Sequence, residues 1–84
     1  MASRKIVKSV HSSEQAQFCA LMIDSRKAAG FTQAELAQKL HKPQSFVAKY
    51  EGGERRIDVV EFLIICRAMA VDPIKIVRAL VKAI

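Results

Sequence analysis

The sequence predicts an all-α protein, a compact bundle of five helices in 84 residues. Three segments have the pattern of a capping box, in which Ser, Thr or Asp precedes Glu or Gln by three residues at a helix start. These pairs are Ser12 with Gln15, Thr32 with Glu35, and Asp58 with Glu61. Asp72 followed by Pro73 indicates one more helix start, because proline is well tolerated in the first helical turn. Strand signals are almost absent.

The predicted helices divide the chain into one domain and a short extension. The first helix is expected from Glu14 to about Ala29, where Gly30 ends it, and the last runs from Asp72 to the C-terminus. The helical domain therefore spans residues 12–84. Residues 1–11 are expected to form a basic N-terminal arm, which is either a disordered tail, an arm that reaches a DNA groove or an added strand.

Residues 32–51 indicate two short helices separated by a tight break. Leu36, Ala37 and Leu40 give the first of them an apolar face. The break falls at residues 41–43, and Pro43 is expected in the first turn of the second helix because proline is poorly tolerated further inside. Two helices joined in this way in a small basic chain favour a helix-turn-helix that binds DNA.

The second of these helices has one face suited to DNA. Placed at about 100° per residue, its small and polar residues share one arc: Gln44, Ser45, Ala48 and Lys49. Its large apolar residues share the other: Phe46, Val47 and Tyr50. Amide and ammonium groups can bond to base edges in the major groove. The alternative is an ordinary amphipathic helix whose polar face is only solvated.

Composition agrees with a nucleic-acid partner. The chain has 14 basic and 8 acidic residues and a formal net charge of +6, which favours a polyanion. Lys42, Arg55 and Arg56 flank the second helix and are expected to contact phosphates. The two cysteines, Cys19 and Cys66, are expected to be reduced core residues of a cytoplasmic protein. No signal peptide or membrane span is evident, so no membrane partner is expected.

The sequence does not favour an enzyme. His11 and His41 are the two histidines, and neither lies in a metal-ligand, nucleophile or paired-carboxylate pattern. Gly52 and Gly53 follow a helix rather than a strand, unlike a phosphate-binding loop. No metal and no cofactor are therefore expected.

The last helix is apolar on more than one face, which favours a homodimer. One face can close the domain's own core, and the surplus would pair with a second copy. The residues expected at this dimerisation surface are Ile76, Val77, Leu80, Val81 and Ile84. The alternative is a helix buried entirely within the monomer.

Three segments resemble the Cro/repressor-like (XRE) family of bacterial and phage helix-turn-helix proteins, whose domains are lambda-repressor-like. They are GFTQAELAQKL (30–40), PQSFVAKYE (43–51) and GERRIDVVEFLIICRAMAVDP (53–73). The resemblance implies that Gln33 contacts a phosphate and that Ala37 lies where the two helices of the motif meet. It also implies that Gln44, Ser45 and Lys49 contact bases.

The resemblance implies, in addition, a buried ion pair between Arg26 and Glu51. The chain departs from the family pattern at two positions. His41 replaces the usual glycine of the turn, where the backbone often needs a positive φ that histidine adopts less readily. Gly52 replaces a basic residue that is common before the glycine after the second helix.

These observations predict a transcription regulator that binds a palindromic operator as a homodimer. With no effector domain, repression by occlusion is the simplest mechanism, and activation through RNA polymerase is the other. A restriction–modification controller and an antitoxin with a toxin partner are alternatives of the same fold, distinguishable by the neighbouring genes. A helical adaptor without DNA affinity is a third alternative.

Overall fold

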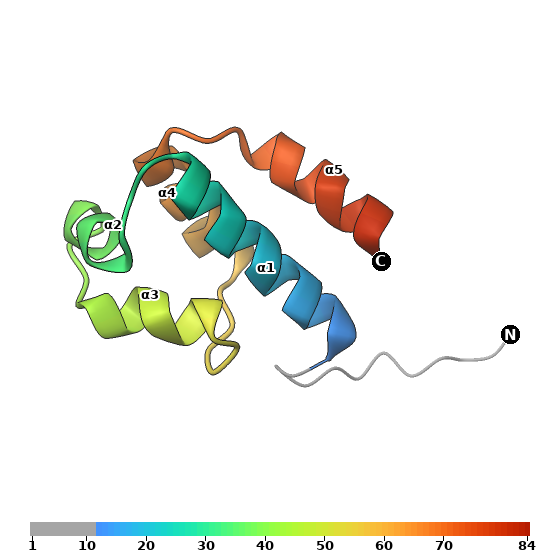
Figure 1. Ribbon diagram of the computed structural model, residues 1–84, viewed down its shortest axis with the longest axis horizontal. Helices are drawn as coiled ribbons and strands as arrows, with labels where there is room; N and C mark the ends of the chain where they lie inside the picture. The colour runs from blue at the N-terminus through green and yellow to red at the C-terminus, as the bar shows by residue number, and fades with distance from the viewer. Residues whose placement is uncertain (1–11) are drawn as a thin grey trace, which may run out of the picture.

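Five helices make up most of the part of the chain that the computed structural model describes, residues 12–84 (Figure 1). They are α1 (Ser13–Ala28), α2 (Gln33–Lys39), α3 (Gln44–Glu51), α4 (Val59–Met69) and α5 (Pro73–Ala83). No strand occurs in residues 12–84, so the predicted all-α five-helix bundle is confirmed. The predicted N-terminal arm, residues 1–11, lies outside the described residues.

Two capping boxes start α2 and α4 as predicted. The Thr32 hydroxyl accepts a hydrogen bond from the Glu35 backbone N–H at 3.0 Å, and the Glu35 carboxylate accepts one from the Thr32 N–H at 2.9 Å. Asp58 and Glu61 form the same reciprocal pair at 2.7 and 2.9 Å. Each box satisfies two backbone donors that a helix start leaves unpaired, which fixes both boundaries.

The other helix starts differ in detail. At α1 the Ser12 hydroxyl accepts from the Gln15 N–H at 3.1 Å, which is one half of the predicted box. Pro43 is the N-cap of α3, one position before the helical turn in which it was predicted. At α5 the Asp72 carboxylate accepts from the Ile74 N–H at 2.9 Å, as expected for a cap.

The helices enclose one core. Its fully buried side chains come from four helices: Met22, Leu36, Val47, Ile65 and Cys66. Both cysteines are buried free thiols, as the sequence predicts. In Figure 1, α1 crosses the middle of the molecule, with α3 along one side and α5 along the other. The exposed side of α3 is therefore separated from α5 by α1.

None of the helices in the described part of the chain is long and apolar enough to cross a membrane.

Candidate nucleic-acid interface

The break between α2 and α3 is a tight turn centred on His41. His41 has φ 56°, so this histidine adopts the left-handed conformation for which the family usually has glycine. The Lys42 N–H donates to the Ala37 carbonyl at 2.9 Å and closes the turn. Ala37 is 2% exposed, so its small side chain lies inside the two-helix unit. This hydrogen bond and the close packing at Ala37 thus determine how α3 is oriented relative to α2.

The two faces of α3 separate largely as predicted. Val47 and Tyr50 are buried, and Phe46 is half-buried. Three predicted base-contacting residues are exposed: Gln44, Ser45 and Lys49. Ala48, which the sequence places on the same arc of the helix, is half-buried and lies at the edge of this face. A short polar surface with amide, hydroxyl and ammonium groups is therefore open to solvent.

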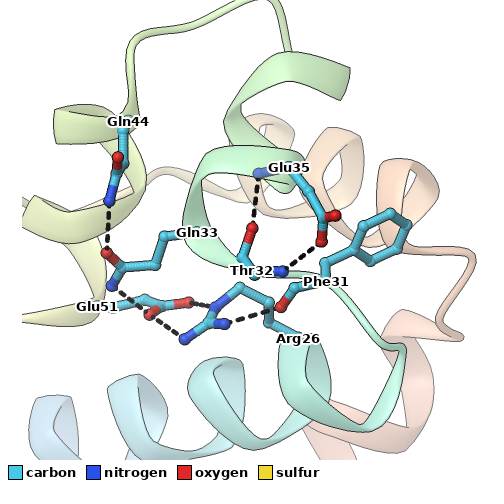
Figure 2. Close-up of polar contacts among 7 residues, drawn as sticks. All are labelled: Arg26, Phe31, Thr32, Gln33, Glu35, Gln44 and Glu51. Atoms are coloured by element: carbon cyan, nitrogen blue, oxygen red, sulfur yellow. Dashed lines mark hydrogen bonds and ion pairs between the residues drawn. The ribbon is translucent and has the colours of Figure 1, made fainter.

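A buried ion pair fastens the end of α3 to α1 (Figure 2). Arg26 Nε donates to Glu51 Oε2 at 2.7 Å, and Arg26 Nη2 donates to Glu51 Oε1 at 3.1 Å. The remaining terminal nitrogen, Nη1, donates to the Phe31 carbonyl at 2.8 Å. The hydrogen bond to Glu51 raises the pKa of Arg26 despite its burial. This is the pair that the family resemblance implies.

Two glutamines extend this network to the exposed start of α3. Gln33 Nε2 donates to Glu51 Oε1 at 2.9 Å, and Gln44 Nε2 donates to Gln33 Oε1 at 3.5 Å (Figure 2). An amide nitrogen carries two hydrogens, so Gln33 keeps one donor for a phosphate. Gln44 keeps its side-chain oxygen and one N–H for a base edge. These contacts between side chains could not be predicted from the sequence pattern.

The basic residues beside α3 are less free than the sequence suggested. Lys42 Nζ lies 5.4 Å and Arg55 Cζ 4.9 Å from the centre of the Phe46 ring. Arg55 also forms an ion pair with Glu61, with Nη2 2.8 Å from Oε2. Arg56 is exposed. Lys42 and Arg55 therefore lie at the edge of the α3 surface, but Arg55 already has an anionic partner.

A second exposed surface is apolar. On α5, Val77 is 45%, Val81 67% and Ile84 66% exposed. Ile76 is 4% exposed and packs in the core, so its place among the dimerisation residues is corrected: its side chain is not available to a partner. Leu80 is half-buried beside it.

Helix α4 also exposes apolar side chains, which could not be predicted from the sequence pattern. Its exposed apolar residues are Val59, Val60, Leu63 and Ile64. Val59 and Val77 line one groove of about 150 Å³ between the two helices. Apolar residues cover nearly every side of α4 in the sequence, so periodicity did not distinguish its core face from its outer face.

The described residues contain no group of three or more His, Cys, Asp or Glu side chains placed to hold a metal ion. His41 is exposed in the turn. The interface is thus made of hydrogen-bonding and cationic groups on α2, α3 and the loop after α3.

A turn of this kind, with its second helix exposed along a polar face, defines a helix-turn-helix protein. A helix-turn-helix family model matches residues 23–76. An XRE-family like protein from Pseudomonas syringae pv. tomato str. DC3000 is 42% identical, with a TM-score of 0.80 over 88% of this chain and 90% of that one. The restriction-modification controller protein C.AhdI from Aeromonas hydrophila is 25% identical, with a TM-score of 0.70 over 77% and 98%. No curated protein matches the chain.

The chain belongs to the XRE family of helix-turn-helix proteins. It is a DNA-binding transcription regulator, in a family whose members are generally not enzymes.

Proposed function

We propose that the chain is a cytoplasmic, sequence-specific repressor that binds a palindromic operator in double-stranded DNA as a homodimer. The observation that carries this proposal is that α3 has a buried apolar face and an exposed polar face. Val47 and Tyr50 anchor the helix in the core, while Gln44, Ser45 and Lys49 are exposed on the opposite face. An exposed polar helix held this rigidly suits the major groove, where its side chains meet base edges.

The residues beside α3 supply the phosphate contacts in this proposal. Gln33 has a free amide hydrogen at the start of α2. Lys42, Arg55 and Arg56 flank α3 and carry positive charge. Phosphate contacts fix the register of the protein on the duplex without distinguishing bases. Base discrimination is assigned to Gln44, Ser45 and Lys49, with Ala48 contributing an apolar contact at the edge of the face.

The exposed apolar residues of α4 and α5 support the homodimer. A patch of this kind on a small protein commonly marks a partner surface, and a two-fold pair covers it with one self-complementary contact. In such a pair the two α3 helices contact half-sites about 34 Å apart, one turn of DNA. The surface is assigned to Val77, Val81 and Ile84 of α5, with Val59 of α4, which lines one groove with Val77.

Selection of bound sequences from a random DNA pool, followed by titration at two salt concentrations, tests the proposal. Enrichment of an inverted repeat with half-sites about one turn apart is the expected result. Gln44→Ala is the matched variant, because it removes one base-contacting group and leaves the buried face of α3 intact. Salt-dependent binding without any sequence preference would overturn the operator claim.

A controller of restriction–modification genes is the second candidate. The observation in its favour is the likeness to C.AhdI, whose chain is matched over 98% of its length. A restriction enzyme and a methyltransferase encoded beside this gene would support that assignment. A neighbouring toxin gene would support an antitoxin instead, with the toxin on the apolar surface. Activation by contact with RNA polymerase is distinguished from repression by transcription from the selected operator in vitro.

A further inference from the structure

Arg55 is held by a carboxylate from α4. Its Nη2 and Nη1 donate to Glu61 Oε2 and Oε1 at 2.8 and 3.3 Å, and Nη1 also donates to the Arg56 carbonyl at 2.9 Å. Both terminal nitrogens of the guanidinium are therefore engaged with Glu61. This two-point arrangement is the one by which arginine also binds a phosphate. A phosphate and Glu61 cannot both occupy that edge of the guanidinium.

Glu61 is itself anchored. Its carboxylate accepts a hydrogen bond from the Asp58 N–H at 2.9 Å, as part of the capping box that starts α4. The carboxylate is thus tied to the first turn of a packed helix. Arg55 cannot take Glu61 with it toward a DNA backbone, so a phosphate contact through the same edge requires the ion pair to open. The hydrogen bonds from Arg55 and Asp58 lower the pKa of Glu61, as expected for hydrogen bonds donated to the charged form of a carboxyl group.

The ion pair lies beside the candidate DNA surface. The Arg55 guanidinium is 4.9 Å from the centre of the Phe46 ring, and Phe46 belongs to α3 next to Ser45. Lys42 Nζ lies 5.4 Å from the same ring, and its positive charge also acts on Glu61. The Glu61 carboxylate is therefore a fixed negative charge close to Arg55 and Lys42, the two cations to which we assign phosphate contacts.

We propose that Glu61 sets the DNA affinity of this protein by competing with a backbone phosphate for the guanidinium of Arg55. This inference rests on the proposed function. Glu61 makes no contact with a base in this scheme. It lowers the affinity for every sequence by the same factor and leaves base preference unchanged, as expected for a group that acts on a phosphate contact.

Glu61→Gln is the variant that tests the proposal. Glutamine at the third helical position preserves a capping box, so α4 keeps its start while the charge of the competitor is lost. The expected result is binding about two- to fivefold tighter on selected and random DNA alike, the size of an exposed ion pair. The dependence of log affinity on log salt should become steeper by about one unit, for one added phosphate contact.

Glu54→Gln is the matched control. Glu54 is exposed on the same loop as Arg55, and its side chain forms no hydrogen bond or ion pair within residues 12–84. The substitution changes net charge by the same amount without opening the ion pair. An equal gain in affinity from Glu54→Gln would overturn the proposal, because general charge would then explain the effect.

A double-variant cycle makes the test specific to Arg55. In an Arg55→Gln background, Glu61→Gln should give less than half of its gain, since no guanidinium is released. Equal gains in both backgrounds, or no gain in a protein with wild-type circular dichroism, would overturn the competition. If wild-type protein shows no salt-dependent DNA binding, the proposed function itself fails. The two failures are distinguished by the wild-type titration alone.

Discussion

Arg26 of α1 and Glu51 at the end of α3 form a two-point ion pair in the interior, with side chains 9% and 3% exposed. The Glu51 carboxylate also accepts a hydrogen bond from Gln33 of α2. One buried carboxylate thus joins three helices and determines how α3 is presented. The pair is well supplied with hydrogen bonds, which a buried charge requires.

Removing one partner of this pair should severely destabilise the fold. Arg26→Met leaves Glu51 buried without its countercharge, and we expect a loss of about 3–5 kcal/mol in the free energy of unfolding. Urea denaturation followed by circular dichroism measures it. Glu54→Gln, an exposed carboxylate change, should stay within about 0.5 kcal/mol. A loss below about 1 kcal/mol for Arg26→Met would mean that the pair does not hold α3 to α1.

Glycine should stabilise the protein at two positions where the backbone is in the left-handed conformation. His41 has φ 56° and Ala70, the C-cap of α4, has φ 59°. A residue with a side chain pays about 1–2 kcal/mol of strain in this region, which glycine removes. Glycine also makes the unfolded chain more flexible, and this offsets part of the gain in stability. His41→Gly and Ala70→Gly should each raise the free energy of unfolding by about 0.5–1 kcal/mol. Thermal denaturation checks both, and Ala20→Gly, at an exposed position in the middle of α1, should instead cost about 1 kcal/mol.

Local signals explain why much of this fold could be predicted. The Thr32 and Asp58 boxes involve residues three apart, so sequence spacing alone determines the hydrogen bonds. The turn at His41 was located because Pro43 cannot lie deep inside a helix. The buried and exposed faces of α3 could be predicted by placing its residues at the helical repeat. The positions of the helices could therefore be predicted without knowledge of tertiary contacts.

The features that could not be predicted involve contacts between elements. Ile76 and Val77 are adjacent apolar residues, and only packing against α1 and α4 determines that Ile76 is in the core while Val77 is exposed. Arg55 was predicted as a phosphate contact from its charge and position. Its pairing with Glu61 depends on the path of the loop between α3 and α4, which no periodicity describes.

Alkaline pH should destabilise the protein partly through Cys66. Burial raises the pKa of the Cys66 thiol to about 11, above the value of 9.0 for an exposed thiol. Between these values the folded state keeps a proton that the unfolded state loses, so stability is full below pH 9 and falls as pH rises toward 11. The slope should approach about 1.4 kcal/mol per pH unit.

Comparison with Cys66→Ala isolates this contribution. The variant is less stable at pH 8 because it leaves a small cavity, but its free energy of unfolding should fall less steeply with pH. Urea denaturation under reducing conditions at intervals from pH 8 to 10.5 measures both slopes. Identical slopes would exclude Cys66 as the cause and would leave Cys19 and Tyr50, whose pKa values burial also raises.

The homodimer should depend on exposed side chains of α5. Val77→Asp adds a charge to the proposed interface, and Val77 is 45% exposed in the single chain, so the fold should survive. We expect sedimentation equilibrium at micromolar concentration to shift from dimer to monomer. Lys82→Glu also introduces a carboxylate, but on the basic stripe of α5, and should leave the dimer intact although its change in net charge is larger. A monomeric wild-type protein would exclude the homodimer altogether.

Gln33 and Gln44 should affect DNA binding differently although their side chains touch. Gln44→Ala removes a base contact, so discrimination at one base pair per half-site should fall by about 1–3 kcal/mol. Gln33→Ala removes a phosphate contact and should weaken binding to all sequences. It also removes the acceptor that holds the Gln44 amide, so part of the discrimination at the same base pair should be lost as well. Competition titrations on single-base operator variants separate the two effects, with Gln38→Ala, exposed on α2, as control. Full discrimination in Gln33→Ala would show that Gln44 is positioned by the DNA itself rather than by Gln33.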